Sequence, residues 1–510
     1  MYNVKKAAIL IMICTIISKV LGFGRELALA YFYGASSISD AYLISLTIPG
    51  VIFSFIGTGI TTGFIPIYTD ILNNKSEKEA NIYMNNIINI LLVVSTIIIA
   101  VTLLFTEEIV KLFAAGFNGD TLKLTMEFTK IYIFGIYFSG IIHIFTGFLQ
   151  INNKFTIPAM IGVVFNILVI VAIIIGAKSN NYIIIVGTLI AKIIEVIIII
   201  PYVYKQRYRY KFILTFKDEN IKKMIYLSIP LILGVSVNQI NVLVDRTIAS
   251  SISIGGISAL NYANRLNLFI QGVFVMSIAT AMYPNISKMA SENNIEGLKD
   301  RIFSAISAIN ILVVPCTIGA IIFSKEIVEI LFGRGAFSSD AIKMTSIALG
   351  YYSIGMIGFG LREILSRLFY SMQDTKTPMI NAAIAMGLNI ILNIILAKKL
   401  GIGGLALATS ISAIVCTILL MINLRVKIGK FDTIGMLKSF TKIIIASIIM
   451  GVISKYIYLN IFNIFNQNIS LIMSIIIGAS VYFIIIYFMK IEELDEVLNS
   501  IINKLKCKSS

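Results

Sequence analysis

The stretch Ser18-Lys19-Val20-Leu21-Gly22-Phe23-Gly24-Arg25-Glu26 lies in the middle of the first long apolar segment of the chain. This segment runs from about residue 7 to residue 33 and is long enough to cross a bilayer as a helix. Charge at bilayer depth costs at least about 2.5 kcal/mol per residue, so it normally faces a polar cavity or a partner. We interpret Lys19 and Arg25 as part of a cationic chamber for an anionic lipid headgroup. The alternative is that Arg25 only pairs with Glu26 or a neighbouring helix and stabilises the bundle.

The composition of the whole chain is that of a polytopic membrane protein. Of its 510 residues, 58% are hydrophobic and only 13% are charged, and the mean hydropathy is +0.92. Soluble domains carry about 25% charged residues. The net charge of +16 could indicate nucleic-acid binding, but basic residues also accumulate in cytoplasmic loops and contact anionic headgroups. We therefore expect no nucleic-acid partner.

The residues that catalysis or a structural metal would need are scarce. The four cysteines show neither metal-ligand spacing nor a disulfide pattern, and we interpret the single histidine, His143, as a packed core residue. We therefore expect a protein that is not an enzyme and has no cofactor. Lys5 and Lys6 precede a short apolar run, as in a signal peptide, but no A-x-A-like cleavage site follows, so an uncleaved first helix is predicted.

Apolar segments of transmembrane length recur along the entire chain and predict fourteen helices. The predicted spans are about 7–33, 38–70, 81–105, 121–150, 155–176, 181–203, 224–250, 256–286, 302–323, 340–370, 378–396, 401–424, 435–458 and 468–489. The large basic clusters lie in the loops after even-numbered helices and near both termini. The positive-inside rule then places both termini in the cytoplasm.

The two halves of the chain resemble each other at a constant separation of roughly 220 residues, as expected for a repeat. Residues 106–113 match 324–331, residues 120–125 match 340–345, and Pro66 corresponds to Pro284. Six helices per repeat is an even number, so both repeats insert the same way up. The predicted fold is all-α, with two parallel-repeat six-helix lobes around a central cavity and two extra C-terminal helices. The predicted domains are residues 1–210, 211–430 and 431–510, the last with a basic tail.

Two arginines are the strongest candidates for contact with an anionic substrate. Arg25 and Arg265 each lie on an early helix of their lobe, beside small or polar residues. The planar guanidinium group suits bidentate phosphate contact, which lysine cannot reproduce. Two arginines from opposed lobes could therefore hold a pyrophosphate. Lys192 and Glu195, three residues apart on one helix, are expected to pair with each other.

A second candidate group is rich in oxygen ligands. Asn389 and Asn393 are spaced to share a helix face, with Thr409 on the next helix and Asp245 on the seventh. One carboxylate with amide and hydroxyl oxygens suits a hard cation such as Na⁺. For the asparagine pair, hydrogen bonding between helices is the alternative.

Several motifs spread over the whole length resemble the MurJ (MviN) lipid II flippases of the MOP transporter superfamily. They are residues 18–26, Asp40-Ala41-Tyr42, Phe64-Ile65-Pro66, Leu243-Val244-Asp245-Arg246, Tyr262-Ala263-Asn264-Arg265-Leu266, residues 284–288 and residues 373–378. The resemblance implies a multi-pass protein of the bacterial cytoplasmic membrane that exports lipid II, a polyprenyl pyrophosphate glycolipid, from the inner to the outer leaflet by alternating access. It also implies coupling to membrane potential or sodium, a tail groove formed by the last two helices and contacts with membrane lipids. We expect a monomer.

The resemblance assigns roles to individual residues. Matched by position, the substrate-binding residues are Lys19, Arg25, Glu26, Asp40 and Arg265. The matching sodium ligands are Asp245, Asn389, Asn393, Thr409 and the backbone carbonyl of Leu405. One departure is that many members have an Arg-Arg pair and an acidic residue early in the second helix, where this chain has Phe53, Ser54 and Thr58. The alternatives are a flippase for another polyprenyl-linked oligosaccharide and a cation-coupled multidrug antiporter of the same superfamily.

Overall fold

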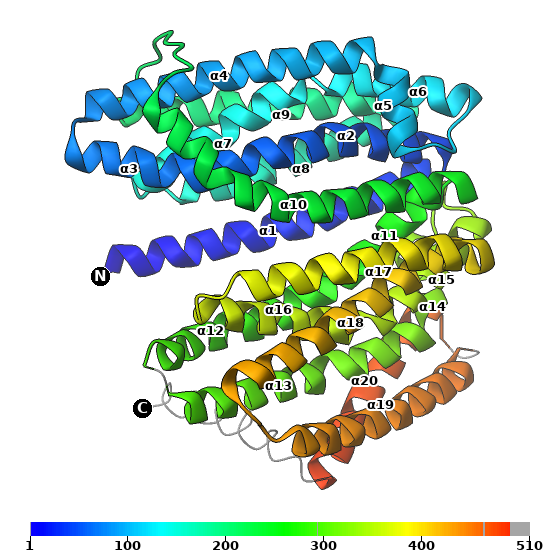
Figure 1. Ribbon diagram of the computed structural model, residues 1–510. Helices are drawn as coiled ribbons and strands as arrows, with labels where there is room; N and C mark the ends of the chain where they lie inside the picture. The colour runs from blue at the N-terminus through cyan, green and yellow to red at the C-terminus, as the bar shows by residue number, and fades with distance from the viewer. Residues whose placement is uncertain (1, 293, 463–464, 490–510) are drawn as a thin grey trace. The chain divides into compact units, whose positions relative to one another are not determined.

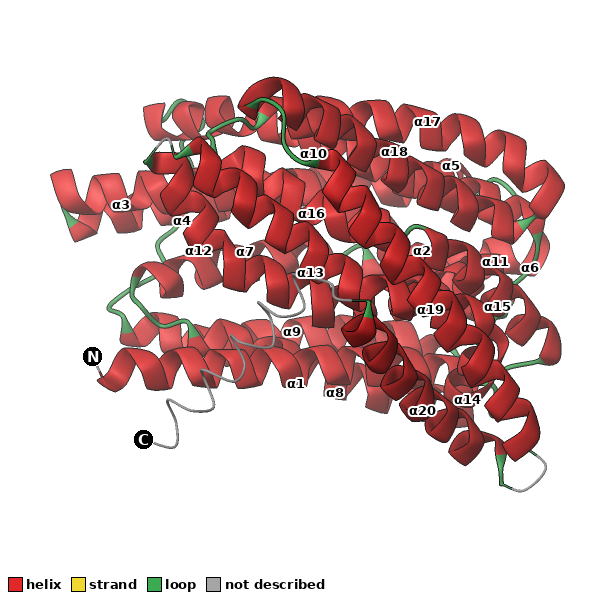
Figure 2. Ribbon diagram, turned by 90° about the horizontal axis from the view of Figure 1, so that it is seen from below, coloured by secondary structure: helices red, strands yellow, loops and turns green. Residues whose placement is uncertain are grey.

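The computed structural model describes residues 2–292, 294–462 and 465–489. Across these ranges all regular structure is helical and no strand occurs (Figures 1 and 2), which confirms the predicted all-α class. The predicted basic tail with Lys504, Lys506 and Lys508 lies outside the described residues. The chain divides into two compact units, which we describe separately. Unit 1 comprises residues 1–258 and 334–338, and unit 2 comprises residues 259–333 and 339–510.

Unit 1 is built from ten α-helices and one short π-helical segment among its described residues. The elements are α1 (Tyr2–Tyr33), α2 (Ser37–Gly59), η1 (Ile60–Phe64), α3 (Ile65–Asn74), α4 (Glu77–Leu104), α5 (Thr106–Phe113), α6 (Gly119–Tyr132), α7 (Gly135–Ile151), α8 (Thr156–Lys178), α9 (Tyr182–Lys205) and α10 (Glu219–Ile252). Helix α2 starts at a capping box, in which Ser36 and Ser39 each bind the other's backbone amide.

Unit 2 contains the remaining elements, the first of which begins just before the unit boundary. They are α11 (Gly256–Ile270), η2 (Gln271–Val275), α12 (Met276–Ser291), α13 (Ile295–Ile322), α14 (Ser324–Phe332), α15 (Ser339–Ile354), α16 (Met356–Ser371), α17 (Lys376–Leu400), α18 (Ile402–Ile428), α19 (Thr433–Ile461) and α20 (Gln467–Phe488).

The described helices account for the predicted membrane spans. Ten are long and apolar enough to cross a membrane, and three bent pairs raise the number to 13. The bent pairs are α6–α7 (42°), the two parts of α10 (50°) and α15–α16 (45°). The remaining predicted span coincides with α1, which is outside this set and carries the central charges Lys19, Arg25 and Glu26. The chain is therefore a multi-pass membrane protein, and the number fourteen is consistent with its helices.

The order of elements in the first half recurs in the second. Helices α1 to α9 correspond one by one to α10 to α18, including the π-helical segment after α2 and after α11. The bent pair α6–α7 likewise corresponds to α15–α16. Helices α19 and α20 follow the second set as additions, as the sequence predicts. The compact units do not follow the predicted boundary at residue 210, because α10 groups with unit 1, so the domain boundaries stay a prediction.

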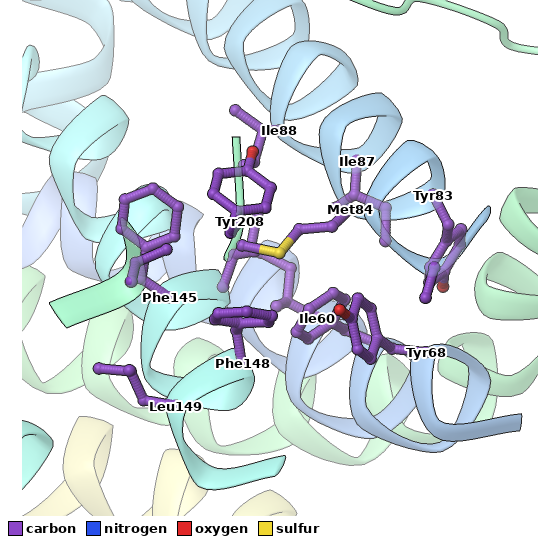
Figure 3. Packing of buried hydrophobic residues seen from close by; sticks show 14 of the residues in the cluster. Ile60, Tyr68, Tyr83, Met84, Ile87, Ile88, Phe145, Phe148, Leu149 and Tyr208 are labelled. Atoms are coloured by element: carbon purple, nitrogen blue, oxygen red, sulfur yellow. The ribbon is translucent and has the colours of Figure 1, made fainter. Parts of the chain in front are cut away.

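An aromatic core holds the helices of unit 1 together at one end (Figure 3). Tyr68 of α3 packs edge-on against Phe148 of α7, with ring centroids 5.7 Å apart. Tyr208, from the connection between α9 and α10, is buried against the same Phe148 at 5.8 Å. Fully burying such a ring stabilises the fold by about 1.5–3 kcal/mol. This core therefore fixes both the helices and the start of a connecting segment.

Candidate functional site

The charged stretch of α1 lies against α8 because small and polar residues let the two helices approach closely. Asn166 of α8 donates a hydrogen bond to the backbone carbonyl of Ser18, 3.2 Å away. A Cβ added at Gly162 would lie only 2.7 Å from the Ser18 hydroxyl, so the two helices are in close contact here. Gly22 also faces Asn166, with 3.7 Å between an added Cβ and the side-chain amide. This packing fixes the turns of α1 that lead to Arg25.

Arg25 and Lys192 lie over the same aromatic ring. The guanidinium carbon of Arg25 is 5.9 Å from the centroid of the Phe165 ring, and the Lys192 ammonium is 4.4 Å from it. Phe165 belongs to α8 and Lys192 to α9, so three helices contribute to this group. Both cationic side chains keep about a fifth of their surface exposed, at 21% and 22%. We call Arg25, Phe165 and Lys192 the cation cluster.

Each cation of the cluster is paired with a carboxylate on its own helix. Arg25 donates from Nη2 to Glu26 Oε1 at 2.9 Å, and Lys192 Nζ donates to Glu195 Oε2 at 2.7 Å. The predicted Lys192–Glu195 pair is thereby confirmed. Both carboxylates are buried, whereas the cations reach accessible space. A guanidinium has five N–H donors, so pairing with Glu26 leaves Arg25 donors for an anionic ligand.

Asp40 occupies a position that sequence reasoning did not anticipate. It is buried at the start of α2 and accepts hydrogen bonds from the backbone amides of Gly255 and Ser258, both at 2.8 Å. The Ser258 hydroxyl also donates to it. Gly255 has a φ of +78°, and an added Cβ would clash with the carbonyl of Ala35. In this geometry Asp40 ties α2 to the α10–α11 junction, and its predicted contact with substrate stays a prediction.

The other predicted substrate-binding residues are not gathered in one described group. Lys19 is exposed on α1 and forms no ion pair with the described residues. Arg265 is exposed on α11 and belongs to unit 2, whereas Arg25 belongs to unit 1. The joint contact of both arginines with a pyrophosphate therefore stays a prediction. Sequence reasoning missed Phe165 as the residue that brings Arg25 and Lys192 together, because hydropathy does not show which face of α8 meets α1 and α9.

The positions that depart from the family pattern carry no charge in α2. Thr58 donates its hydroxyl to the Ser54 carbonyl at 2.7 Å. The Phe53 ring meets the ring of His143 edge-on, with centroids 4.9 Å apart. His143 is exposed, so the expectation of a packed core histidine is wrong. The reason is that its position on α7 faces away from the aromatic core formed by Phe145 and Phe148.

Four of the five predicted sodium ligands lie together in unit 2. Asn393 donates to Asn389 Oδ1 at 2.8 Å, Asn389 donates to the Thr409 hydroxyl at 3.3 Å, and Thr409 donates to the Leu405 carbonyl at 2.9 Å. The amide, hydroxyl and carbonyl oxygens of this set suit a hard cation. The hydrogen bond from Asn389 of α17 to Thr409 of α18 also satisfies the alternative, a polar contact that joins two helices. Asp245 belongs to unit 1, so its part in the set stays a prediction.

Unit 2 also contains an apolar cavity of about 370 Å³. It is lined by α11, η2, α13 and α14 on one side and by the added helices α19 and α20 on the other. Residues that line it include Phe274, Cys316, Phe323, Met450, Tyr482 and Phe483. The Tyr482 hydroxyl donates to the Ile311 carbonyl at 2.7 Å and so leaves only the ring for the cavity wall. An apolar ligand segment fits this lining.

The arrangement of helices defines a class of membrane transporter. A solved structure titled "Lipid II flippase MurJ, inward closed conformation" superposes with a TM-score of 0.83 at 30% identity and covers 94% of this chain and 99% of that chain. An inward-facing multidrug MATE transporter of the MOP superfamily gives a TM-score of 0.70 at 14% identity, covering 83% and 98%, and shows the shared fold alone. The chain thus shares its fold with both transporters.

The sequence identifies the family within this class. Residues 29–479 match the family described as "Lipid II flippase MurJ". The "Lipid II flippase MurJ" of Thermosipho africanus is 30% identical over 479 residues, which cover 94% of this chain and 95% of that protein. The "Probable lipid II flippase MurJ" of Thermotoga maritima is 28% identical, with 95% and 96% covered. The chain belongs to the MurJ lipid II flippase family, which confirms the predicted resemblance and a transporter rather than an enzyme.

Proposed function

We propose that this chain carries lipid II from the inner to the outer leaflet of the cytoplasmic membrane by alternating access. Its family membership and its multi-pass helical fold support this role. The observation that carries the proposal is the cation cluster, in which Arg25 and Lys192 lie over Phe165 at membrane depth. A diphosphate needs concentrated positive charge when it leaves water, and arginine supplies two parallel donors for it.

The apolar cavity of unit 2 is consistent with the same substrate, because it fits the lipid tail. A polyprenyl chain has no hydrogen-bonding groups, and the cavity wall formed by α13, α14, α19 and α20 is almost entirely hydrocarbon. Because the surrounding lipid is equally apolar, such a surface binds a hydrocarbon tail by van der Waals packing. We infer that the added helices provide the groove for part of the lipid tail. The headgroup and tail of one substrate thus explain both a charged and an apolar site.

The test is complementation of a bacterium depleted of its own lipid II flippase. Arg25→Ala should abolish growth. Arg25→Lys should support growth weakly, because lysine keeps the positive charge but lacks the two parallel donors of the guanidinium group. Lys178→Ala, at the exposed end of α8, is the matched control and should grow normally. Protein amounts in the membrane are measured for each variant. Wild-type growth with Arg25→Ala at normal protein amounts would remove Arg25 from the mechanism.

We also propose that Na⁺ binds the oxygen ligands of unit 2 and that its binding is coupled to transport together with membrane potential. Asn389, Asn393, Thr409 and the Leu405 carbonyl supply neutral oxygens. The carboxylate of Asp245, expected from the family, would supply the charge. Purified protein should unfold at a higher temperature in NaCl than in KCl, since a ligand that binds only the folded state stabilises it. Asp245→Asn should remove most of this difference, and an unchanged sodium response would overturn the site.

The orientation is part of the same proposal. The basic residues near both ends and in the α9–α10 connection favour cytoplasmic termini under the positive-inside rule. A cysteine introduced at the exposed Asn74, at the end of α3, should then react with thiol reagents only from the cytoplasmic side. Reaction from outside intact cells would reverse the topology.

A further inference from the structure

The connection between α9 and α10, residues 206–218, has no regular structure (Figure 1). Hydrogen bonds attach it to α4. Three asparagines of α4 bind its backbone. Asn86 receives a hydrogen bond from the Thr215 amide at 2.8 Å and donates to the Thr215 carbonyl at 2.9 Å. Asn89 donates to the Ile213 carbonyl at 2.9 Å, and Asn85 accepts from the Lys211 amide at 3.1 Å.

Two tyrosines complete this attachment. Tyr208 is buried among Phe145 and Phe148, and its hydroxyl donates to Asn85 Oδ1 at 2.6 Å (Figure 3). The Tyr210 hydroxyl donates to Asn89 Oδ1 at 2.6 Å. A buried asparagine side chain without a hydrogen-bond partner costs free energy, and this one segment supplies partners to all three asparagines. We call residues 207–217 the strap.

The side chains that the strap leaves outside are basic and aromatic. Arg207, Arg209 and Lys211 are exposed and form no ion pair with any carboxylate among the described residues. Between and beyond them, Phe212 is 76% exposed and Phe216 is 57% exposed. The nearest acidic residue in sequence, Asp218, is engaged as the N-cap of α10 through the Asn220 amide. The strap therefore presents uncompensated positive charge next to exposed rings.

The attachment places the strap beside the half of α4 whose charged first turn we infer to lie at a membrane interface. Helix α4 has 28 residues, and at about 1.5 Å per residue it is about 42 Å long, which exceeds the roughly 30 Å hydrocarbon core. The strap binds Asn85, Asn86 and Asn89 in the half of α4 that begins with the charged residues Glu77, Lys78 and Glu79. Aromatic rings and basic side chains together are the pattern that binds headgroups and the adjoining acyl chains.

We propose that the strap is a binding surface for anionic phospholipids, with Arg207 and Lys211 on the headgroup phosphates and Phe212 inserted among the acyl chains. Basic side chains that alternate with exposed rings favour a surface of anionic headgroups and acyl chains as the occupant. The backbone hydrogen bonds to α4 allow the segment to lie at the interface without unpaired carbonyls at Arg209, Ile213 and Thr215. This inference concerns bulk lipids and does not depend on the transported substrate.

The chain has no tryptophan, so Phe212→Trp introduces a single fluorescent probe at the strap. The full-length variant is placed in nanodiscs of phosphatidylcholine and phosphatidylglycerol at equal mole fractions. Bromine, which quenches tryptophan, is carried by the acyl chains of one lipid or of the other. Enrichment of anionic lipid by about fivefold per basic residue predicts at least twofold stronger quenching from brominated phosphatidylglycerol. Equal quenching by the two lipids would overturn the anionic selectivity, and no quenching by either would overturn membrane insertion.

Phe105→Trp is the matched control, because Phe105 is 53% exposed at the opposite end of α4 beside Glu107 and Glu108. It should be quenched equally by the two brominated lipids. In the Phe212→Trp background, Arg207→Gln with Lys211→Gln should reduce the preference while leaving the thermal unfolding temperature unchanged. An unchanged preference would exclude these two residues as its source. If an added acidic protein, but not anionic lipid, shifts the emission of the tryptophan introduced at the strap, the surface belongs to a protein partner and the proposal fails.

Discussion

The cation cluster of unit 1 and the apolar cavity of unit 2 use opposite chemistry. Arg25 and Lys192 bring two charges to one aromatic ring at membrane depth, each with a buried carboxylate partner. The cavity beside α19 and α20 is lined mostly by hydrocarbon and sulfur, and its one tyrosine hydroxyl is bonded to the backbone. A substrate with a diphosphate and a long hydrocarbon chain needs both kinds of surface. Changes at the two sites should therefore affect different parts of the substrate.

The largest effect is expected at Lys192. Lys192→Ala removes one charge-assisted contact, worth about 1.5–3 kcal/mol, so the affinity for lipid II should fall at least tenfold. Glu195→Gln is the matched variant, since it frees Lys192 from its partner and should leave the affinity equal or higher. Binding is measured by native mass spectrometry of purified protein. A similar loss in both variants would mean that the ion pair has only a structural role.

The cavity gives the complementary prediction. A Cβ at Gly319 of α13 meets nothing within 4 Å, so Gly319→Leu should fill the cavity without strain. A filled cavity excludes the tail segment that packs in it and removes its van der Waals contacts, so the affinity for full-length lipid II should fall. An analogue with a short prenyl chain should bind as it does to the wild type. Gly387→Leu, also in open space but away from the cavity, is the control. An equal loss of affinity for the long-chain and short-chain forms would show that the lipid tail does not bind in the cavity.

A smaller effect is expected where α19 is tied to α14. Lys455 binds Glu326 at 2.5 Å and lies over the rings of Phe323 and Tyr458. Lys455→Met keeps the apolar stem but loses the pair, which is partly exposed and is therefore worth no more than about 1 kcal/mol. The thermal unfolding temperature should fall by a few degrees at most, whereas Lys438→Met, exposed on the same helix, should have no effect. If Lys455→Met lost binding of the lipid II headgroup, this would contradict the separate roles of the cation cluster and the apolar cavity.

The smallest effect concerns pH. Asp374, in the turn between α16 and α17, accepts a hydrogen bond from Lys427 at 2.6 Å, which together with the Thr377 amide lowers the pKa of Asp374 to about 2. Since its unfolded pKa is about 3.9, the stabilisation is complete above about pH 4 and is lost as the pH falls toward 2. Asp374→Asn should slightly lower the unfolding temperature at neutral pH and flatten its decline between about pH 4 and 2. An identical decline in both proteins would show that this pair does not stabilise the fold.

The helices could be predicted from sequence because each must supply about 20 apolar residues to cross a bilayer. The Lys192–Glu195 pair was also predictable, since i,i+3 spacing fixes its geometry within one helix. Phe165 was not, because hydropathy does not show which face of α8 meets α1 and α9. The buried position of Asp40 was equally hidden, since it depends on the distant Gly255 and Ser258. The sequence does indicate that another segment binds α4, because the buried amides of Asn85, Asn86 and Asn89 require hydrogen-bond partners.

The role of the cation cluster depends on contact between the Arg25 guanidinium and the diphosphate of lipid II. Solid-state NMR on the full-length protein, with ¹⁵N-labelled arginine and bound lipid II, measures this contact as dephasing between the side-chain nitrogens and phosphorus. Dephasing is expected in the wild type and should be clearly reduced in Arg25→Lys at equal lipid II occupancy. The same dephasing in both proteins would show that Arg25 does not contact the diphosphate.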